Sequence, residues 1–179
     1  MIVKVKQGGY TPQPVSSPSP PSPFSDWFLP SVDEIGEMYT NLYLEGVGDL
    51  LSGDHATSTE ISATQCRYIE MGSGTFTTTL KTATLIVRAC RYFTDTVGAY
   101  SLRDTGPGGG LIFYIDGAGT TYYEAYATNQ SISQEWSNVT STEIGTTGTA
   151  IGTGLANTLA IINQDGHTSS AAKLCNDLS

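Results

Sequence analysis

A proline-rich stretch near the beginning of the chain limits which residues can form a folded core. Residues 8–23 read GGYTPQPVSSPSPPSP, and each proline there lacks a backbone N–H and favours extended polyproline conformation. We therefore predict an N-terminal strand and arm over residues 1–24, followed by a single domain over residues 25–179. The arm has two interpretations: a disordered tail, or a tether that docks on a neighbouring subunit.

Apolar and charged side chains alternate in residues 2–6, which is typical of a short exposed strand or of an edge that pairs with a neighbour. In the tether interpretation, this strand binds other structural proteins of an assembly, and the protein forms homo-oligomers. The residues expected to make this assembly contact are Ile2, Val3, Val5 and Tyr10.

Composition restricts the class of the domain and its partners. Twenty glycines, many threonines and only 14% charged residues are typical of a loop-rich domain with strands and few long helices. A formal charge of -9 with eight Lys and Arg argues against nucleic acid and against anionic membranes. No stretch approaches the roughly 18 apolar residues of a membrane span, and no secretory leader is recognisable. We expect the protein to act where it is made, or to leave the cell by lysis or within a particle.

Local signals predict the order of the elements. Ser31 and Glu34 form a capping-box pattern, and apolar residues then recur at helical spacing for about three turns. Residues 67–93 are rich in β-type residues, with a turn at the glycines of residues 72–74 and a last, central strand over residues 84–93.

The second half of the chain completes an α+β fold class. A glycine-opened strand, a tight Asp116-Gly117 turn and a second strand predict a β-hairpin over residues 106–128. Two helices are predicted around residues 155–164 and 169–178, separated by a stop signal at Asp165-Gly166.

Known catalytic and metal-binding patterns are absent from the sequence. The glycine run of residues 106–110 precedes a strand and lacks the Lys-Ser/Thr of a phosphate loop. His55 and His167 are the only histidines, and no motif supplies a nucleophile or a third ligand. We predict no catalytic residue, no metal and no cofactor. The three cysteines are interpreted as buried thiols, with a Cys90–Cys175 bridge as the alternative.

Aromatic and amide side chains are the best candidates for a binding surface, because aromatic rings stack on sugars while amides form hydrogen bonds. Trp27 is interpreted as a core anchor at a helix entry. The predicted ligand-binding residues, displayed outward, are Trp136, Tyr122, Tyr123 and Asn138.

Several segments together resemble a known family. The chain resembles the C-terminal domain of collagen-like (Lcl-type) adhesins, a branch of the C-type lectin superfold. The segments that carry the resemblance are YSLRDTGPGGGLIFYI, NQSISQEW, GTAIGTGLANTLAII, SSAAKLCNDLS, SDWFLPSVDEIGEMY, TSTEISAT and LIVRACRYF, which cover nearly everything except the arm.

The order of these segments differs from that of the family. In the family the SSAAKLCNDLS helix runs directly into the DWFLPS segment, whereas here the first lies at residues 169–179 and the second follows the arm. The resemblance therefore implies a circularly permuted C-type-lectin-like fold. Residues 94–105 would bridge two neighbouring strand ends, and the new termini would lie close together. Alternatively, the connection is made between subunits.

Two departures from the family bear on function. Ala56 replaces a tryptophan that the family usually has before its serine-rich motif, and the calcium-site signatures of sugar-binding lectins are absent. The superfold also includes sulfatase-activating oxidases, which need cysteines near a substrate groove, whereas Cys90 falls in a predicted strand and Cys175 in a predicted helix.

The leading hypothesis is a non-enzymatic structural or receptor-facing protein on the surface of a phage-like particle, such as a decoration, fibre or tail-associated protein. It would be made in the host cytoplasm and joined to its scaffold by the arm, with cell-surface glycan as a further partner. The alternative is a soluble bacterial carbohydrate-binding or adhesin module at the cell surface. A redox enzyme is the third hypothesis.

Overall fold

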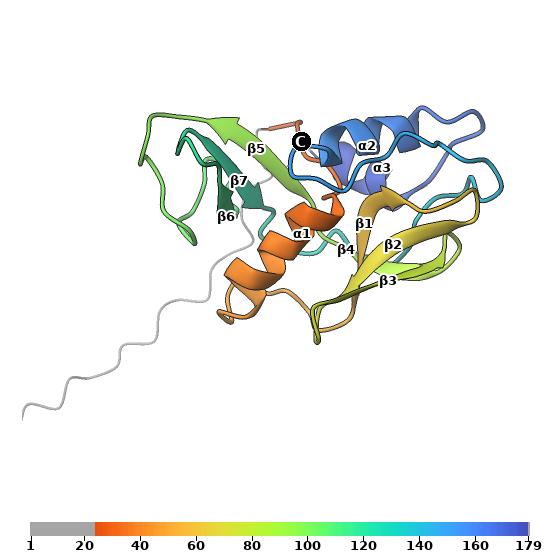
Figure 1. The fold of residues 1–179 in the computed structure, drawn as a ribbon, viewed down its shortest axis with the longest axis horizontal. Coiled ribbons are helices and arrows are strands. Elements are labelled where there is room, and N and C mark those ends of the chain that lie inside the picture. Colours follow the sequence, from red (N-terminus) through yellow and green to blue (C-terminus); the bar gives the residue numbers. More distant parts are fainter. Residues whose placement is uncertain (1–23, 179) are drawn as a thin grey trace, which may run out of the picture.

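The computed structural model describes residues 24–178, which form a mixed α+β fold (Figure 1). Residues 1–23, with the predicted assembly residues Ile2, Val3, Val5 and Tyr10, lie outside the described part of the chain. Within the described part, no helix is both long and apolar enough to cross a membrane.

The first helix begins where the sequence predicts. Helix α1 (Val32–Met38) is capped by Ser31, whose hydroxyl accepts the N–H of Glu34 while the Glu34 carboxylate accepts the N–H of Ser31. This reciprocal capping box satisfies N–H groups that the first turn leaves without partners. The helix continues through a π-helical turn, η1 (Tyr39–Tyr43), so the predicted three turns are confirmed.

The larger sheet has five strands in the order β3-β2-β1-β4-β8. Antiparallel pairing joins β2 to both β1 and β3, and β8 to β4, whereas β1 and β4 run parallel. The turn between β2 and β3 contains Gly72, Ser73 and Gly74, so the predicted hairpin there is confirmed. The five strands are β1 (Asp54–Glu60), β2 (Gln65–Glu70), β3 (Thr75–Leu80), β4 (Thr84–Val87) and β8 (Ser131–Glu135).

The smaller sheet contains β5 (Cys90–Thr94), β7 (Thr121–Ala125) and β6 (Leu111–Ile115) in that order. Strands β6 and β7 are the predicted hairpin around Asp116-Gly117. The prediction of one strand over residues 84–93 is wrong, because the chain leaves the larger sheet after β4 and enters the smaller one at β5. An apolar run shows that a segment is buried, but it does not mark where the backbone turns from one sheet to another.

Helices cover both faces of the larger sheet (Figure 1). Helix α1 contacts β1 and β2, and it also contacts β6 of the smaller sheet. On the opposite face lie α2 (Gly154–Ile162), which contacts β1, and α3 (Ala171–Asn176), which contacts β4. Both closing helices are where the sequence predicts them.

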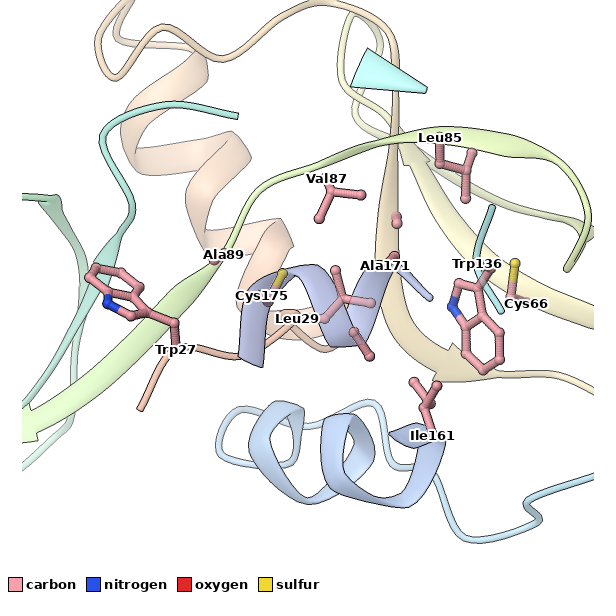
Figure 2. Packing of buried hydrophobic residues seen from close by; sticks show 12 residues of the cluster. Trp27, Leu29, Cys66, Leu85, Val87, Ala89, Trp136, Ile161, Ala171 and Cys175 are labelled. Atoms are coloured by element: carbon pink, nitrogen blue, oxygen red, sulfur yellow. The ribbon is translucent and has the colours of Figure 1, made fainter. Parts of the chain in front are cut away.

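Two hydrophobic clusters fill the spaces between these layers. One lies between the larger sheet and helices α2 and α3, and it contains Trp27, Trp136 and Cys175 (Figure 2). The other is built around α1 and includes Met38, together with Phe113 of the smaller sheet. Trp27 is therefore the core anchor that the sequence predicts.

The beginning and the end of the described chain interlock. The N–H of Leu29 donates to the Thr158 hydroxyl at 3.0 Å, and the N–H of Asp33 donates to the Thr149 carbonyl at 2.9 Å. Trp27 shares its hydrophobic cluster with residues of α3. The chain segment that precedes α1 thus packs against the segments that close the domain.

The expected bridge between neighbouring strand ends is wrong. Residues 94–105 follow β5 and lead to β6, but these two strands lie on either side of β7 and do not pair with each other. The connection therefore passes β7, and the hydroxyl of Tyr122 on β7 helps to hold it by donating to the Thr96 carbonyl at 2.9 Å.

Candidate functional site

Three buried glutamates organise the loops of the domain. Glu34 lies on α1, Glu60 at the end of β1 and Glu124 on β7, and all three are buried. Each carboxylate accepts hydrogen bonds from backbone N–H groups of a glycine-containing loop. A buried carboxylate needs such partners, because it has lost the water that would otherwise solvate its charge.

Glu124 fills the centre of the glycine-rich run at residues 106–110. Its carboxylate accepts the N–H groups of Gly108 at 2.9 Å and of Gly110 at 3.2 Å, and Arg91 Nη1 donates to it at 2.6 Å. A Cβ atom at Gly108 would lie 2.7 Å from Glu124 Oε1, so the close approach requires glycine. This loop has the N–H array of an anion site, and the protein's own carboxylate occupies it.

The same network reaches the first described residues. Arg91 Nε and Nη2 bind the two oxygens of Asp26 at 2.6 Å and 2.8 Å, in the bidentate geometry that suits a guanidinium and a carboxylate. The ring of Phe24 lies 4.0 Å from the same guanidinium. Arg91 therefore joins the segment before α1 to β5 and to the loop around Glu124.

Glu60 and Lys81 form a fully buried ion pair at 2.5 Å. The second oxygen of Glu60 accepts the N–H groups of Ile144 at 2.8 Å and Gly145 at 3.0 Å. The Lys81 ammonium also lies 5.2 Å from the centre of the Trp136 ring. The pair fastens the long connection between β8 and α2 to the larger sheet.

The Glu34 carboxylate accepts hydrogen bonds both from its own capping box and from a distant loop. Besides Ser31, its carboxylate accepts the N–H of Gly152 at 2.8 Å, just before α2. Burial raises the pKa of Glu34, and the hydrogen bonds to Ser31, Gly152 and Gly154 oppose that rise. The residue thus couples the start of α1 to the start of α2.

The predicted outward display of three aromatic residues is wrong. Trp136 and Tyr122 are fully buried, and Tyr123 is 6% exposed. The Trp136 indole Nε1–H donates to the Thr57 carbonyl at 2.7 Å, which satisfies the one polar group of a core side chain. The polar residues around Trp136 in the sequence hid this burial, since Glu135 and Asn138 are exposed while the indole is buried.

Asn138, the fourth predicted ligand-binding residue, is exposed, but its amide is used within the protein. Its Nδ2 donates to the Gly166 carbonyl at 2.9 Å, and its Oδ1 accepts the N–H groups of Thr168 and Ser169. The structure does not bring the four predicted residues together. Among the aromatic residues of the described chain, Tyr92 on β5 is 40% exposed, and the sequence did not single it out.

The cysteines and acidic residues are dispersed. Cys66, Cys90 and Cys175 are buried and unbridged. Burial raises the pKa of Cys66 to about 12 and raises those of the other two thiols as well. Across residues 24–178, no group of three or more His, Cys, Asp or Glu side chains is placed to hold a metal ion.

A cavity of about 210 Å³ lies beside Arg88, between the Gly48-Asp49 turn and the smaller sheet. The guanidinium donates to the carbonyls of Tyr126 at 2.6 Å and Asp49 at 2.9 Å and to the side chain of Asn129 at 2.9 Å. Asp49 adopts a left-handed φ of 50°, which directs its carbonyl to the arginine. Arg88 therefore links the Gly48-Asp49 turn to the segment after β7 through these hydrogen bonds.

His55 is a buried histidine next to this region. Its Nδ1 pairs with the Gly53 carbonyl at 3.0 Å, while Nε2 has no hydrogen-bond partner. Burial lowers the pKa of His55 to about 4, and the nearby Arg88 charge acts in the same direction. The imidazole is therefore neutral in the folded protein near pH 7, with its Nδ1–H donating to Gly53.

We expect His55 to make stability depend on pH. The folded protein keeps the imidazole neutral down to about pH 4, whereas the unfolded chain binds a proton below about pH 6.5, the ordinary pKa of histidine. The free energy of unfolding should therefore fall by about 3 kcal/mol from this residue as the pH drops from about 6.5 to about 4. Urea unfolding of the protein and of His55→Gln across this range measures the difference, and a difference that does not change with pH would contradict the prediction.

Comparison of the chain with family models, with curated proteins and with solved structures yields no match.

Proposed function

We propose that this chain is a non-enzymatic structural protein displayed on the surface of a phage-like particle, with residues 1–24 as its attachment arm. The observation that carries the proposal is the separation of charge along the chain. Residues 1–23 hold two of the eight cationic side chains and none of the 17 acidic ones, so residues 24–179 hold six cations against 17 acids. A basic arm on an acidic body is an arrangement suited to docking on other acidic copies or on an acidic scaffold.

Burial strengthens this separation. Three cations of the body, Lys81, Arg88 and Arg91, are buried in the interactions described above, as are three of its acids. The cations of the described body that are not buried are Arg67, Arg103 and Lys173, and the last two pair with acidic neighbours. The surface of the body is therefore strongly acidic, which favours solubility and keeps neighbouring bodies apart.

The internal architecture supports a display role. Buried carboxylates hold the loops around residues 106–110, 144–145 and 152–154 in fixed positions, so the body presents a rigid surface. A displayed domain gains from such rigidity, because ordered loops lose less conformational entropy when they bind.

We further propose that the body is a circularly permuted relative of the C-type-lectin-like domains. Support comes from the placement of Trp27 and residues of α3 in one hydrophobic cluster. In the family that the chain resembles, the segments corresponding to α3 and to the stretch around Trp27 are consecutive. A permuted chain must still pack them side by side.

The arm deletion tests the proposed function. A chain that lacks residues 1–23 should remain folded, because Phe24 and Asp26 keep their contacts with Arg91, but it should no longer be recovered with particles. Mass spectrometry of density-purified particles, from cultures that produce either the full chain or the truncated chain, measures this.

A double charge reversal, Lys4→Glu with Lys6→Glu, is the matched control for arm length. It keeps every residue of the arm and should still lower recovery, because it removes the basic charge. Recovery of the full chain only as free protein, or normal incorporation of the truncated chain, would contradict the proposal.

A further inference from the structure

Strand β3 presents an open edge. It pairs with β2 through all six of its residues without a bulge, and no other strand of the described chain pairs with its opposite side. None of its residues is buried. An edge of this kind exposes backbone donors and acceptors that can pair with another strand.

The other sheet edges are better protected. Strand β5 is partly covered by a bridge between Phe28 and Cys90, and β6 by a bridge between Thr105 and Leu111. The pairing of β8 with β4 contains a register shift, which twists an edge away from regular pairing. By contrast β3, with the sequence TFTTTL, has no charge, no proline and no bulge.

The backbone groups that β3 offers can be identified. The N–H of Lys81 donates to the Thr64 carbonyl at 2.9 Å, so these opposite residues form a hydrogen-bonded pair. Such pairs alternate along an antiparallel ladder, and Phe76, Thr78 and Leu80 therefore direct their N–H and C=O groups away from β2. The Leu80 carbonyl already accepts a bond from the following turn, which leaves Phe76 and Thr78 as the complete partners for an added strand.

A groove of mixed character lies beside the start of this edge. It has a volume of about 380 Å³ and lies between α1 and β3. Its apolar lining includes Val32, Tyr39 and Phe76, and its acidic lining consists of Asp33 and Glu37. A strand added to β3 would place every second side chain over this groove. The suitable occupant is therefore an extended segment that carries both apolar and basic side chains.

We propose that residues 2–6 of a second copy of the chain add to the free edge of β3, with Lys4 and Lys6 directed towards Asp33 and Glu37. This inference rests on the proposed function, in which the arm joins subunits. The sequence IVKVK places Ile2 and the two lysines on one face of a strand and its two valines on the other. The valines would then lie beside the methyl groups of Thr77 and Thr79.

The length and position of the arm favour a second copy over the same chain. Phe24 contacts Arg91 of β5 in the smaller sheet, whereas β3 is the outer strand of the larger sheet, at the other end of the molecule (Figure 1). Residues 7–23 could span roughly 50 Å in polyproline conformation at about 3.1 Å per residue. In that conformation the spacer would be long enough to bring its strand to the β3 edge of a second copy.

Proline substitution at Thr78 tests the edge specifically. The Thr78 N–H points away from β2, so Thr78→Pro removes a donor needed by an added strand and leaves the β2–β3 ladder intact. Thr78→Val keeps that donor and is the matched control. We expect the full-length chain and Thr78→Val to self-associate equally in sedimentation experiments. The association constant of Thr78→Pro should be lower by about tenfold or more. Circular dichroism confirms that each variant is folded.

Three outcomes would overturn the inference: equal association of Thr78→Pro and the unmodified chain, a monomeric unmodified chain at every concentration, or protection of the Thr78 amide from hydrogen exchange in a monomer. The last outcome would mean that the arm binds its own body. Failure of the proposed function is distinguishable from these results. If deletion of the arm abolishes particle recovery while Thr78→Pro is recovered normally, the proposed function stands and the β3 site is wrong. If the chain self-associates but is never recovered with particles, the β3 site stands and the proposed function is wrong.

Discussion

A Lys81→Met variant is expected to lose about 3–5 kcal/mol of its free energy of unfolding, because it leaves the buried Glu60 carboxylate without its cation. Neither side chain of the pair has appreciable contact with solvent, and Glu60 also holds the backbone of Ile144 and Gly145. Methionine fills a similar volume, so the loss measures the removal of the charge and not a cavity. Urea or guanidinium unfolding, followed by tryptophan fluorescence, measures the difference.

Two further variants make this experiment specific. Lys173→Met removes a lysine whose exposed ion pair with Asp177 spans 2.7 Å, and it should change stability by less than about 1 kcal/mol. Adding Glu60→Gln to Lys81→Met should restore part of the loss, because the uncompensated charge disappears while the side-chain oxygen still accepts the loop N–H groups. Equal effects of Lys81→Met and Lys173→Met would show that the buried pair does not stabilise the fold.

A Trp136→Ala variant is expected to lose about 3–5 kcal/mol and to expose the core rather than to lose a binding surface. The ring is fully buried in the cluster between the larger sheet and helices α2 and α3 (Figure 2). Its N–H donates to the Thr57 carbonyl. The substitution creates a cavity and leaves that carbonyl without its partner. The unfolding midpoint in urea provides the measurement.

Ile132→Ala is a suitable control for this substitution. Ile132 lies on β8, four residues before Trp136, and is 72% exposed, so its truncation should cost less than about 1 kcal/mol. A Trp136→Ala protein that unfolds at the same urea concentration as the unmodified chain would contradict the core role of the indole. It would also favour the predicted role of Trp136 in sugar binding.

Elements with strong local signals could be predicted from the sequence. The capping box at Ser31 and Glu34, the Asp116-Gly117 turn and the glycines of residues 72–74 each determine the backbone through interactions within a few residues. For such elements the information is contained in the segment itself, and the structure agrees with the prediction.

The central strand of the larger sheet could not be predicted in this way. Strand β1 reads DHATSTE, a polar sequence, yet only its first residue is exposed. Its hydroxyl groups bond distant backbone groups: Thr57 Oγ1 donates to the Arg67 carbonyl and Thr59 Oγ1 to the Gly148 carbonyl. Polar residues can occupy a core when groups elsewhere in the chain supply their hydrogen bonds, and the local sequence pattern does not reveal those groups.

The candidate binding residues were misplaced for a related reason. Tyr122 reads as a surface residue in a polar hairpin, but its hydroxyl binds the 94–105 connection while its ring stacks on Phe93. The buried Glu60, Glu124 and Lys81, conversely, look like ordinary surface charges in the sequence. Their partners lie 14 to 85 residues away along the chain, so only the tertiary fold distinguishes them from solvated side chains.

The interlock between the two ends of the described chain also governs when the protein can fold. Leu29 bonds Thr158, a residue 129 positions later, and Trp27 shares a hydrophobic cluster with α3 at the end of the domain. During synthesis the earliest segments of the domain therefore lack their partners until α2 and α3 have left the ribosome. The domain should acquire its native packing only after α2 and α3 have been synthesised, when the N-terminal arm has long been free to meet another molecule.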